Sequence, residues 1–242
     1  MDTKLIEEMG AELTTEGKTK RIYRLPDGNF IMEFTDAVTG KDGNFNPEAN
    51  RAGLKIAGMG LQSHQLTEYF FDRIEESVIK THRIKLEGTE KEKLSPNAML
   101  VKKVELFGPG LACTCWKKAT GSLVERYYKI LEKGQSLNNL FEISLKDDVA
   151  GNPLITEDLL YQTGLFRTGV YKALRNYTER ITNIISEEFA KKDAQLIHLK
   201  LEFGMRAGEL ILIDEISAGC MRVENENGEE LSPDEIYNLI FS

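Results

Sequence analysis

The 242-residue chain has few cysteines and no long hydrophobic run. Its three cysteines, Cys113, Cys115 and Cys220, are too few for a disulfide framework, and the first two have the wrong spacing for a usual zinc pair. On a strand Cys113 and Cys115 would share a face, so we interpret them as small core residues. No apolar stretch approaches the roughly 18 residues that span a membrane. The charged start, Met1–Glu8, lacks the apolar core of a signal peptide. These absences predict a cytoplasmic protein without a membrane association.

The chain also lacks an excess of positive charge. Its formal net charge is −8, so the overall balance does not favour binding to nucleic acid or to an anionic membrane. The hydrophobic fraction of 41% and the charged fraction of 29% are ordinary for a soluble globular protein. A small anionic substrate would therefore need a locally basic site. The length suits one large domain or two small ones, and no internal repeat or low-complexity segment is present.

Hydrophobic periodicity predicts a mixture of strands and helices. A β-hairpin is expected over 14–34 around a turn at 26–28, and the long Gly-, Asn- and Asp-rich stretch 36–60 is expected to be a functional loop. Further predictions are helices over 61–77 and 157–191, strands within 99–115 (interrupted at 108–110) and over 141–145, and a capped helix beginning at Ser232 and Pro233. The predicted fold class is α+β, with a strand-rich N-terminal half followed by helices packed on a second sheet.

The most informative feature is a pair of carboxylates, Glu202 and Asp214, on two strand-like runs. In the first run the odd-numbered residues from 197 to 203 are apolar, and a turn from Gly204 to Gly208 is expected between the runs. A regular hairpin would place both carboxylates on one face of a sheet. Two buried carboxylates are costly unless a cation neutralises them, so one interpretation is a Mg²⁺ site with room for phosphate oxygens. A solvated hairpin face is the alternative.

Basic and small residues at three other places suit a phosphate or a nucleotide. Lys18 and Lys20 lie two positions apart beside a glycine, where both amines could converge on a polyphosphate; a solvated basic strand is the alternative. Lys146 follows a predicted strand and precedes two aspartates, so it could contact nucleotide and metal or belong to a surface turn. The dipeptide Gly121-Ser122 could bind phosphate through backbone amides, but by itself it carries little information.

Several short motifs occur in one order along the chain. They are Glu16–Tyr23 (EGKTKRIY), Phe34–Asp36 (FTD), Thr81-His82, Gly121–Leu123 (GSL), Lys146–Asp148 (KDD), Lys200–Gly204 (KLEFG) and Asp214–Ser217 (DEIS), followed by Arg222. Together they resemble the SAICAR synthetase family (phosphoribosylaminoimidazole-succinocarboxamide synthase) over roughly residues 15–222. The KLEFG and DEIS motifs, at the family's spacing, are the most specific part of the resemblance.

The resemblance implies an ATP- and Mg²⁺-dependent ligase of de novo purine biosynthesis. Such enzymes use ATP to phosphorylate the carboxylate of CAIR, a ribosyl-phosphate aminoimidazole. The amine of L-aspartate then attacks the acyl phosphate, giving SAICAR, ADP and phosphate. The implied fold has a small β-rich N-terminal lobe, placed at residues 1–105, and a larger ATP-grasp-like lobe, placed at residues 106–242. A homo-oligomer, either a dimer or a higher assembly, is also implied.

The same resemblance implies roles for individual side chains. Lys18, Lys20, Asp36 and Lys200 would be catalytic; Lys18, Lys20 and Lys146 would bind ATP; Ser122, Lys200 and Arg222 would bind the substrate; and Glu202 and Asp214 would bind Mg²⁺. Transfer of a phosphoryl group depends mainly on positioning and on neutralisation of negative charge, which is the chemistry that ammonium groups and a metal ion provide.

The sequence departs from the family's pattern on the substrate side. Trp116 stands where the family has an arginine expected to bind the substrate, and Lys117 or Lys118 could supply the charge. A lysine does not reproduce the fork of a guanidinium. Gly219 stands where the family has an aspartate expected near the aminoimidazole. Two alternatives therefore stay open: a paralogous ligase that joins a different heterocyclic carboxylate and amine, or a nucleotide-binding protein without catalysis.

Overall fold

The computed structural model describes residues 3–41, 44–48, 52–88 and 94–242. The elements in chain order are α1 (Thr3–Glu8), β1 (Glu12–Glu16), β2 (Lys20–Arg24), β3 (Phe30–Phe34), β4 (Ala37–Lys41), β5 (Asn44–Phe45), β6 (Ala52–Lys55), α2 (Met59–Glu76), β7 (Ala98–Val101), β8 (Glu105–Leu106), β9 (Leu111–Lys118), α4 (Gly121–Tyr127), β10 (Ser136–Leu145), α5 (Glu157–Gln162), α6 (Val170–Ala190), β11 (Gln195–Arg206), β12 (Glu209–Ile213), a 3₁₀ turn (Ala218–Cys220), β13 (Met221–Glu224) and α7 (Pro233–Phe241). The predicted α+β class is confirmed.

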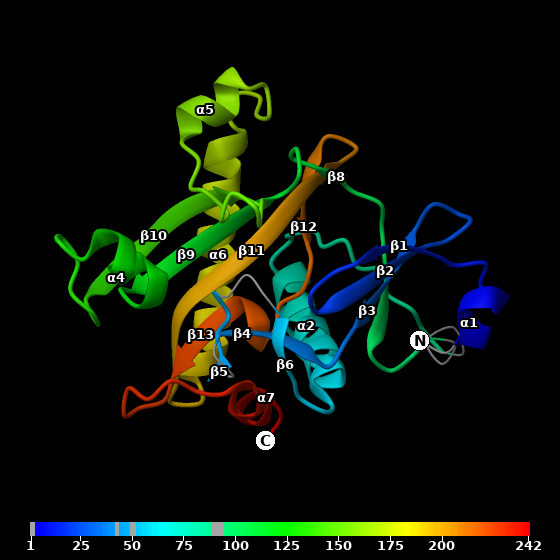
Figure 1. Cartoon of the computed structure of the whole chain (residues 1–242), viewed down its shortest axis with the longest axis horizontal. Helices are drawn as coiled ribbons and strands as arrows, with labels where there is room; N and C mark the ends of the chain where they lie inside the picture. The colour runs from blue at the N-terminus through cyan, green and yellow to red at the C-terminus, as the bar shows by residue number, and fades with distance from the viewer. Residues whose placement is uncertain (1–2, 42–43, 49–51, 89–93) are drawn as a thin grey trace.

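Two antiparallel sheets organise the chain (Figure 1). The four-stranded sheet has the order β1-β2-β3-β7, and the larger sheet has the order β10-β9-β11-β12, with β8 and β13 also pairing to β11. A small third sheet, β5-β4-β6, comes from the stretch that was expected to be a loop. The helix α6 packs across one face of the larger sheet, and α2 lies between the two sheets in the view of Figure 1. The proposed boundary between lobes at residues 105 and 106 stays a prediction.

Alternation along β11 divides the larger sheet into a core face and a polar face. Leu199, Leu201 and Phe203 are at most 2% exposed and pack in the core shared with α6. On the neighbouring strand β9, Cys113 and Cys115 are fully buried, which confirms their interpretation as core residues. Each buried apolar side chain of this size contributes roughly 1.5–3 kcal/mol to the stability of the fold. The intervening polar residues of both strands therefore project from the opposite face.

Two helix predictions are confirmed by their local chemistry. In α2 the apolar positions Leu66, Phe70 and Ile74 are buried, as the helical spacing predicts, whereas Leu61 of the same pattern is exposed. At the start of α7, Ser232 and Glu235 form a capping box. Pro233 at the first helical position removes no needed donor there. No helix within the described ranges has both the length and the apolarity to cross a membrane.

Three expectations from the sequence are wrong in detail. The stretch 36–60 contains the strands β4, β5 and β6 and the start of α2, so it is not simply a loop. The helical region 157–191 is divided into α5 and α6, with left-handed glycines at Gly164 and Gly169 between them. The turn of the β11–β12 hairpin is at Ala207 and Gly208, while Gly204 lies within β11. A Cβ at Gly204 would lie 2.4 Å from Val104 Cγ1, so this glycine serves the close crossing of β8.

Candidate active site

A cavity of about 1270 Å³ lies where the four-stranded sheet faces the polar side of the larger sheet. Such a volume exceeds the roughly 300–1,000 Å³ of a typical small-molecule pocket, so more than one small ligand can be accommodated. Residues of β2, β9, β10, β11 and the segment after β12 line the cavity. Seven of the predicted site residues are among them: Lys18, Lys20, Ser122, Lys146, Lys200, Glu202 and Asp214. Asp36 and Arg222 are not among the lining residues.

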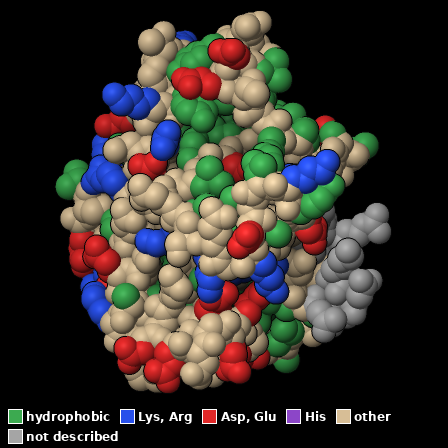
Figure 2. Space-filling view, turned by 90° about the vertical axis from the view of Figure 1, so that its left-hand side faces the viewer, with side chains coloured by type: hydrophobic (Ala, Val, Ile, Leu, Met, Phe, Trp, Pro, Cys, Tyr) green, Lys and Arg blue, Asp and Glu red, His purple; other side chains and the backbone are tan. Residues whose placement is uncertain are grey.

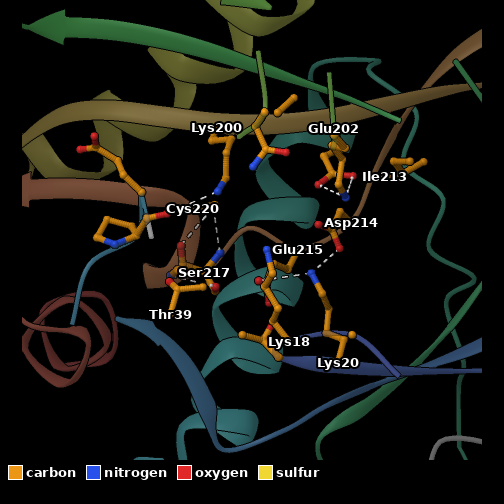
Figure 3. A pocket seen from close by; sticks show the side chains of 18 of the residues that line it. Lys18, Lys20, Thr39, Lys200, Glu202, Ile213, Asp214, Glu215, Ser217 and Cys220 are labelled. Atoms are coloured by element: carbon orange, nitrogen blue, oxygen red, sulfur yellow. Dashed lines mark hydrogen bonds and ion pairs between the residues drawn. The ribbon is translucent and has the colours of Figure 1, made fainter. Parts of the chain in front are cut away.

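Glu202 and Asp214 meet, but not through regular strand alternation. The hairpin pairs Glu202 with Ile213, so continued pairing would set Asp214 opposite Leu201, whose side chain belongs to the core. The strand β12 ends at Ile213, and Asp214 takes a left-handed backbone conformation with φ +67°. This turn brings its carboxylate to the side of Glu202, close enough for the two groups to affect each other's pKa (Figure 3 shows both side chains). The two carboxylates therefore lie together as expected, although the turn at Asp214 brings this about and strand alternation does not.

Two ammonium groups neutralise part of this acidic cluster. Lys20 donates a hydrogen bond to Asp214 and lies 3.3 Å from Glu215 Oε1. Lys146 Nζ donates to both carboxylate oxygens of Glu202, at 2.6 and 2.7 Å (Figure 3 shows the cluster). Three carboxylates thus face two ammonium groups, and the cluster retains negative charge. Glu215 was missed as a site residue, although it follows Asp214 directly in the DEIS motif.

The pKa values of the cluster reflect burial and crowding of like charges. Burial and the nearby charge of Asp214 raise the pKa of Glu202 to about 7. Burial opposes ionisation of Asp214 as well, but Lys20 and Lys146 outweigh it and hold the pKa of Asp214 well below its usual value. Burial lowers the pKa of Lys20, and the surrounding carboxylates more than reverse that effect. Glu202, although bonded to Lys146, is therefore easier to protonate than Asp214.

The donor set at this cluster fits Mg²⁺. No group of three or more His, Cys, Asp or Glu side chains is placed to ligate a metal in the part of the chain that the structure describes. Mg²⁺ does not need one, because it is usually held by one or two carboxylates together with phosphate oxygens and water. Glu202 and Asp214 supply two such carboxylates beside a large cavity. Their surplus negative charge is what a divalent cation would neutralise.

Lys18 lies in the bend between β1 and β2 and joins the two sides of the cavity. Its ammonium group is 2.8 Å from the carboxylate of Asp148, in the turn after β10. The neighbouring Asp147 accepts hydrogen bonds from the backbone N–H groups of Val149 and Ala150, which shapes that turn. Lys18 and Lys20 both line the cavity, but their ammonium groups have different partners.

The substrate-side residues Ser122 and Arg222 converge on Glu48, which the sequence did not single out. The N–H of Ser122 donates to Glu48 Oε2 at 2.7 Å, and Arg222 Nε donates to Glu48 Oε1 at 2.7 Å. Lys200 Nζ contacts the carbonyl oxygen of Pro47 at 3.4 Å. No sequence signal pointed to Glu48, because its partners are more than 70 residues away along the chain.

Asp36 lies outside the cavity lining and connects two neighbouring elements of the fold. Its Oδ1 accepts a hydrogen bond from the N–H of Gly60 at 3.0 Å, which ties the start of β4 to the start of α2. A Cβ at Gly60 would lie 2.7 Å from the carbonyl oxygen of Phe34, so this approach requires glycine. The catalytic role expected for Asp36 stays a prediction.

Trp116 is held between a carboxylate and a histidine on the cavity wall. Its indole Nε1–H donates to Glu142 Oε2 at 2.9 Å, and its ring stacks on His198 with centroids 4.6 Å apart. Arg126 also donates to Glu142, at 2.5 Å, and to the hydroxyl of Ser122, at 3.2 Å. The guanidinium of Arg126 thus lies beside the cavity.

The two lysines considered as replacements for the family's arginine are differently placed. Lys118 forms an ion pair with Glu224. Neither Lys117 nor Lys118 is among the residues that line the cavity, whereas Arg126 is. Gly219, the second departure, lines the cavity and donates its N–H to Ser217 Oγ at 3.1 Å. Among the residues that line the cavity, Arg126 is therefore the one that brings a guanidinium to this side.

His198 should make the protein less stable in mild acid. Burial lowers the pKa of His198 from 6.5 to about 3, although the charge of Glu48 partly opposes the shift. As pH falls below 6.5, the unfolded chain takes up a proton at this position before the folded chain does. The contribution of His198 to the free energy of unfolding is therefore fully present above pH 6.5. Between pH 6.5 and the pKa of the folded state it falls by about 1.4 kcal/mol per pH unit.

The test compares unfolding at two pH values in the wild type and in His198→Gln. Urea titration at pH 7.5 and at pH 5 gives the loss of unfolding free energy for each protein. We expect the loss to be smaller in the variant by about 2 kcal/mol, because glutamine does not titrate. The comparison between pH values removes any packing cost of the substitution at the stack with Trp116. Equal losses in the two proteins would contradict the assignment.

Comparisons with known proteins agree on one family. The family model of SAICAR synthetase matches residues 13–236. The chain is 39% identical over 227 residues to the phosphoribosylaminoimidazole-succinocarboxamide synthase of Clostridium tetani (strain Massachusetts / E88), covering 93% of this chain and 97% of the relative. It is 33% identical over 229 residues to the synthase of the same name from Bacillus mycoides (strain KBAB4), covering 93% and 88%. A solved structure, a SAICAR synthetase (Type-2) in complex with ADP, matches with a TM-score of 0.79 at 28% identity, covering 93% of this chain and 96% of that chain.

Proposed function

The chain belongs to the SAICAR synthetase family, and from this premise we propose how its cavity performs the family's reaction. The family catalyses the ATP-dependent ligation of CAIR and aspartate in purine biosynthesis, forming a C–N bond. The observation that carries the assignment of roles is the partly buried cluster of Glu202, Asp214, Lys20 and Lys146 on the wall of one large cavity. Such a cluster has little structural use without a cation and phosphates.

ATP is proposed to lie on the side of the cavity formed by β2, β3 and β7. Apolar side chains there, among them Ile22, Met32 and Val101, suit an adenine ring. Lys18, Lys20 and Lys146 lie where they could exchange their carboxylate partners for phosphate oxygens. An ammonium group aimed at the transferring phosphoryl group stabilises its developing charge.

Glu202 and Asp214 are proposed to hold Mg²⁺. Bound there, the ion would supply positive charge that stabilises the developing charge of phosphoryl transfer. The two carboxylates lie beside one another because Asp214 turns out of strand geometry. Lys20 and Lys146 keep Asp214 ionised, which a metal ligand requires.

CAIR is proposed to bind between the acidic cluster and the segment around Ser122. Arg222 and the Ser122 N–H would hold its phosphate, and Lys200 would hold a carboxylate. The CAIR carboxylate oxygen then attacks the γ-phosphorus of ATP, and ADP leaves. The aspartate nitrogen attacks the acyl carbon, phosphate leaves, and the nitrogen loses a proton as the amide forms. Positioning the two acceptors in one cavity makes each attack effectively intramolecular.

Assembly and location stay predictions. A homo-oligomer and a cytoplasmic location are proposed from family membership.

Figure 2 shows acidic and basic side chains interspersed over one face of the molecule, with hydrophobic side chains gathered towards its top, where Figure 1 places α5.

The test of the proposed function is ADP release by the purified protein with Mg²⁺-ATP, CAIR and L-aspartate. Each acceptor is omitted in turn, and SAICAR is sought by mass. Release that requires both acceptors, with SAICAR formed, is expected. Clear Mg²⁺-ATP binding without release would instead favour a paralogous ligase with a different carboxylate substrate, for which Trp116 and Gly219 would be the reason.

A further inference from the structure

Glu48 is held by a built anion site. Its two carboxylate oxygens accept from the Ser122 N–H and from Arg222 Nε, both at 2.7 Å. Arg222 Nη2 also donates to Asn46 Oδ1 at 2.9 Å, and the same oxygen accepts from the Glu48 N–H. The carboxylate packs so closely on Gly121 that a Cβ there would lie 2.3 Å from Glu48 Oε1. The side chains of Glu48 and Arg222 are only 14% and 12% exposed.

These contacts are the ones that a bound phosphate would need. A guanidinium and a backbone N–H are ordinary phosphate donors, and charge-assisted hydrogen bonds from them are strong. The site therefore already contains an anion, and it comes from the protein itself. Segment 46–48 also places the carbonyl oxygen of Pro47 on Lys200, so the same segment occupies a second substrate-side cation.

We propose that Glu48 is an internal competitor that occupies the phosphate site and that a phosphorylated ligand must displace. The proposal rests on the proposed function, since it concerns the end of the substrate that Arg222 and Ser122 would bind. A phosphate dianion carries more charge and more acceptor oxygens than one carboxylate, so it can replace Glu48 on these donors. A ribosyl hydroxyl is neutral and cannot. Glu48 therefore lowers the affinity of the site for phosphate, because it competes for the same donors of Ser122 and Arg222.

The first test measures phosphate affinity directly. Trp116, the chain's single tryptophan, lines the same cavity and stacks on His198, which lies close enough to Glu48 to feel its charge. Its fluorescence is followed while ribose 5-phosphate or inorganic phosphate is added to the wild type and to Glu48→Gln. Glutamine keeps the shape of the side chain, but its neutral amide binds the donors of Ser122 and Arg222 less strongly than a carboxylate does. We expect both ligands to bind about 5- to 30-fold more tightly to Glu48→Gln.

Glu230 provides a matched control. It also forms an ion pair with Arg222, but its side chain is 43% exposed and it does not contact Ser122. Glu230→Gln should change phosphate affinity less than about 3-fold, because exposed ion pairs contribute little. Ribose, which has no phosphate, should bind equally weakly to all three proteins. Equal effects of the two substitutions, or weaker phosphate binding to Glu48→Gln, would overturn the proposal.

A second measurement separates this proposal from the function itself. In the ligase assay, Glu48→Gln should lower the KM for CAIR by a similar factor and leave the KM for ATP unchanged. If the glutamine variant does not fold, Glu48→Ala replaces it in both experiments. Tighter phosphate binding without any CAIR turnover would remove the proposed substrate but keep the role of Glu48. Turnover of CAIR with an unchanged or raised KM in the variant would refute the role of Glu48 alone.

Discussion

Replacing Glu202 with glutamine, or Asp214 with asparagine, is expected to lower kcat by about 1,000-fold or more, because each change removes a proposed ligand of Mg²⁺. Either amide preserves the shape of the side chain. Asparagine also tolerates the left-handed backbone that Asp214 adopts. Both variants should still fold, although Asp214→Asn also loses the ion pair with Lys20 and should melt at a lower temperature than the wild type. ADP release at saturating Mg²⁺-ATP measures the loss, and a Mg²⁺ titration shows whether metal dependence has changed.

The control for this experiment is Glu209→Gln on the same hairpin. Glu209 is 56% exposed and pairs with Lys80 on the surface, away from the cavity lining. Its replacement should leave kcat within about 2-fold of wild type, since exposed pairs of this kind contribute under about 1 kcal/mol. Near-normal activity in either Glu202→Gln or Asp214→Asn would exclude the metal assignment. A loss confined to thermal stability would show that the pair is structural.

Lys20→Met is expected to impair both ATP use and stability. The ammonium group of Lys20 is the partner of Asp214 and Glu215, and its side chain is only 16% exposed. Removing it leaves Lys146 alone against three partly buried carboxylates, which should lower the free energy of unfolding by about 3 kcal/mol. The kcat/KM for ATP should fall by about 100-fold or more, because a cation beside the phosphates is lost.

Lys18→Met is the matched comparison for Lys20→Met. Its ion pair with Asp148 joins side chains that are 36% and 56% exposed, so its loss should cost less than about 1 kcal/mol of stability. Thermal melts with and without Mg²⁺ add a further readout. Mg²⁺ should stabilise Lys20→Met more than it stabilises the wild type, since the ion binds the folded protein's uncompensated carboxylates. Equal stability of the two variants in the absence of Mg²⁺ would contradict this account of the cluster.

Much of the fold could be predicted because local patterns report which side of an element is buried. The alternation of apolar residues along β11 places Lys200 and Glu202 on the polar face, and the structure has them on the cavity wall. The helix α7 begins where its Ser-Pro sequence predicts. The stretch 36–60 is long and rich in Gly, Asn and Asp, which predicts a loop. Its strands β4, β5 and β6 escape prediction because they are short and pair with each other.

The site was harder to predict where residues far apart in the chain decide the geometry. Because Glu202 pairs with Ile213, regular alternation of side chains along β12 would place the Asp214 side chain on the core face of the sheet. The left-handed turn at Asp214 is a backbone conformation that no periodic pattern records. Lys20 reaches it from a strand 194 positions away. Register and crossing geometry, which set these distances, come from the packing of whole sheets.

The sequence by itself determined the α+β class, the two strand-like runs with their carboxylates, and the basic motifs that identify the family. Those features depend on residue type and on spacing, both of which are local. The tertiary structure alone decided that Glu215 joins the acidic cluster and that Glu48 occupies the donors of Ser122 and Arg222. The physical reason is that such contacts depend on where separate segments meet after the core has packed, and side-chain charge then selects partners among the groups brought within reach.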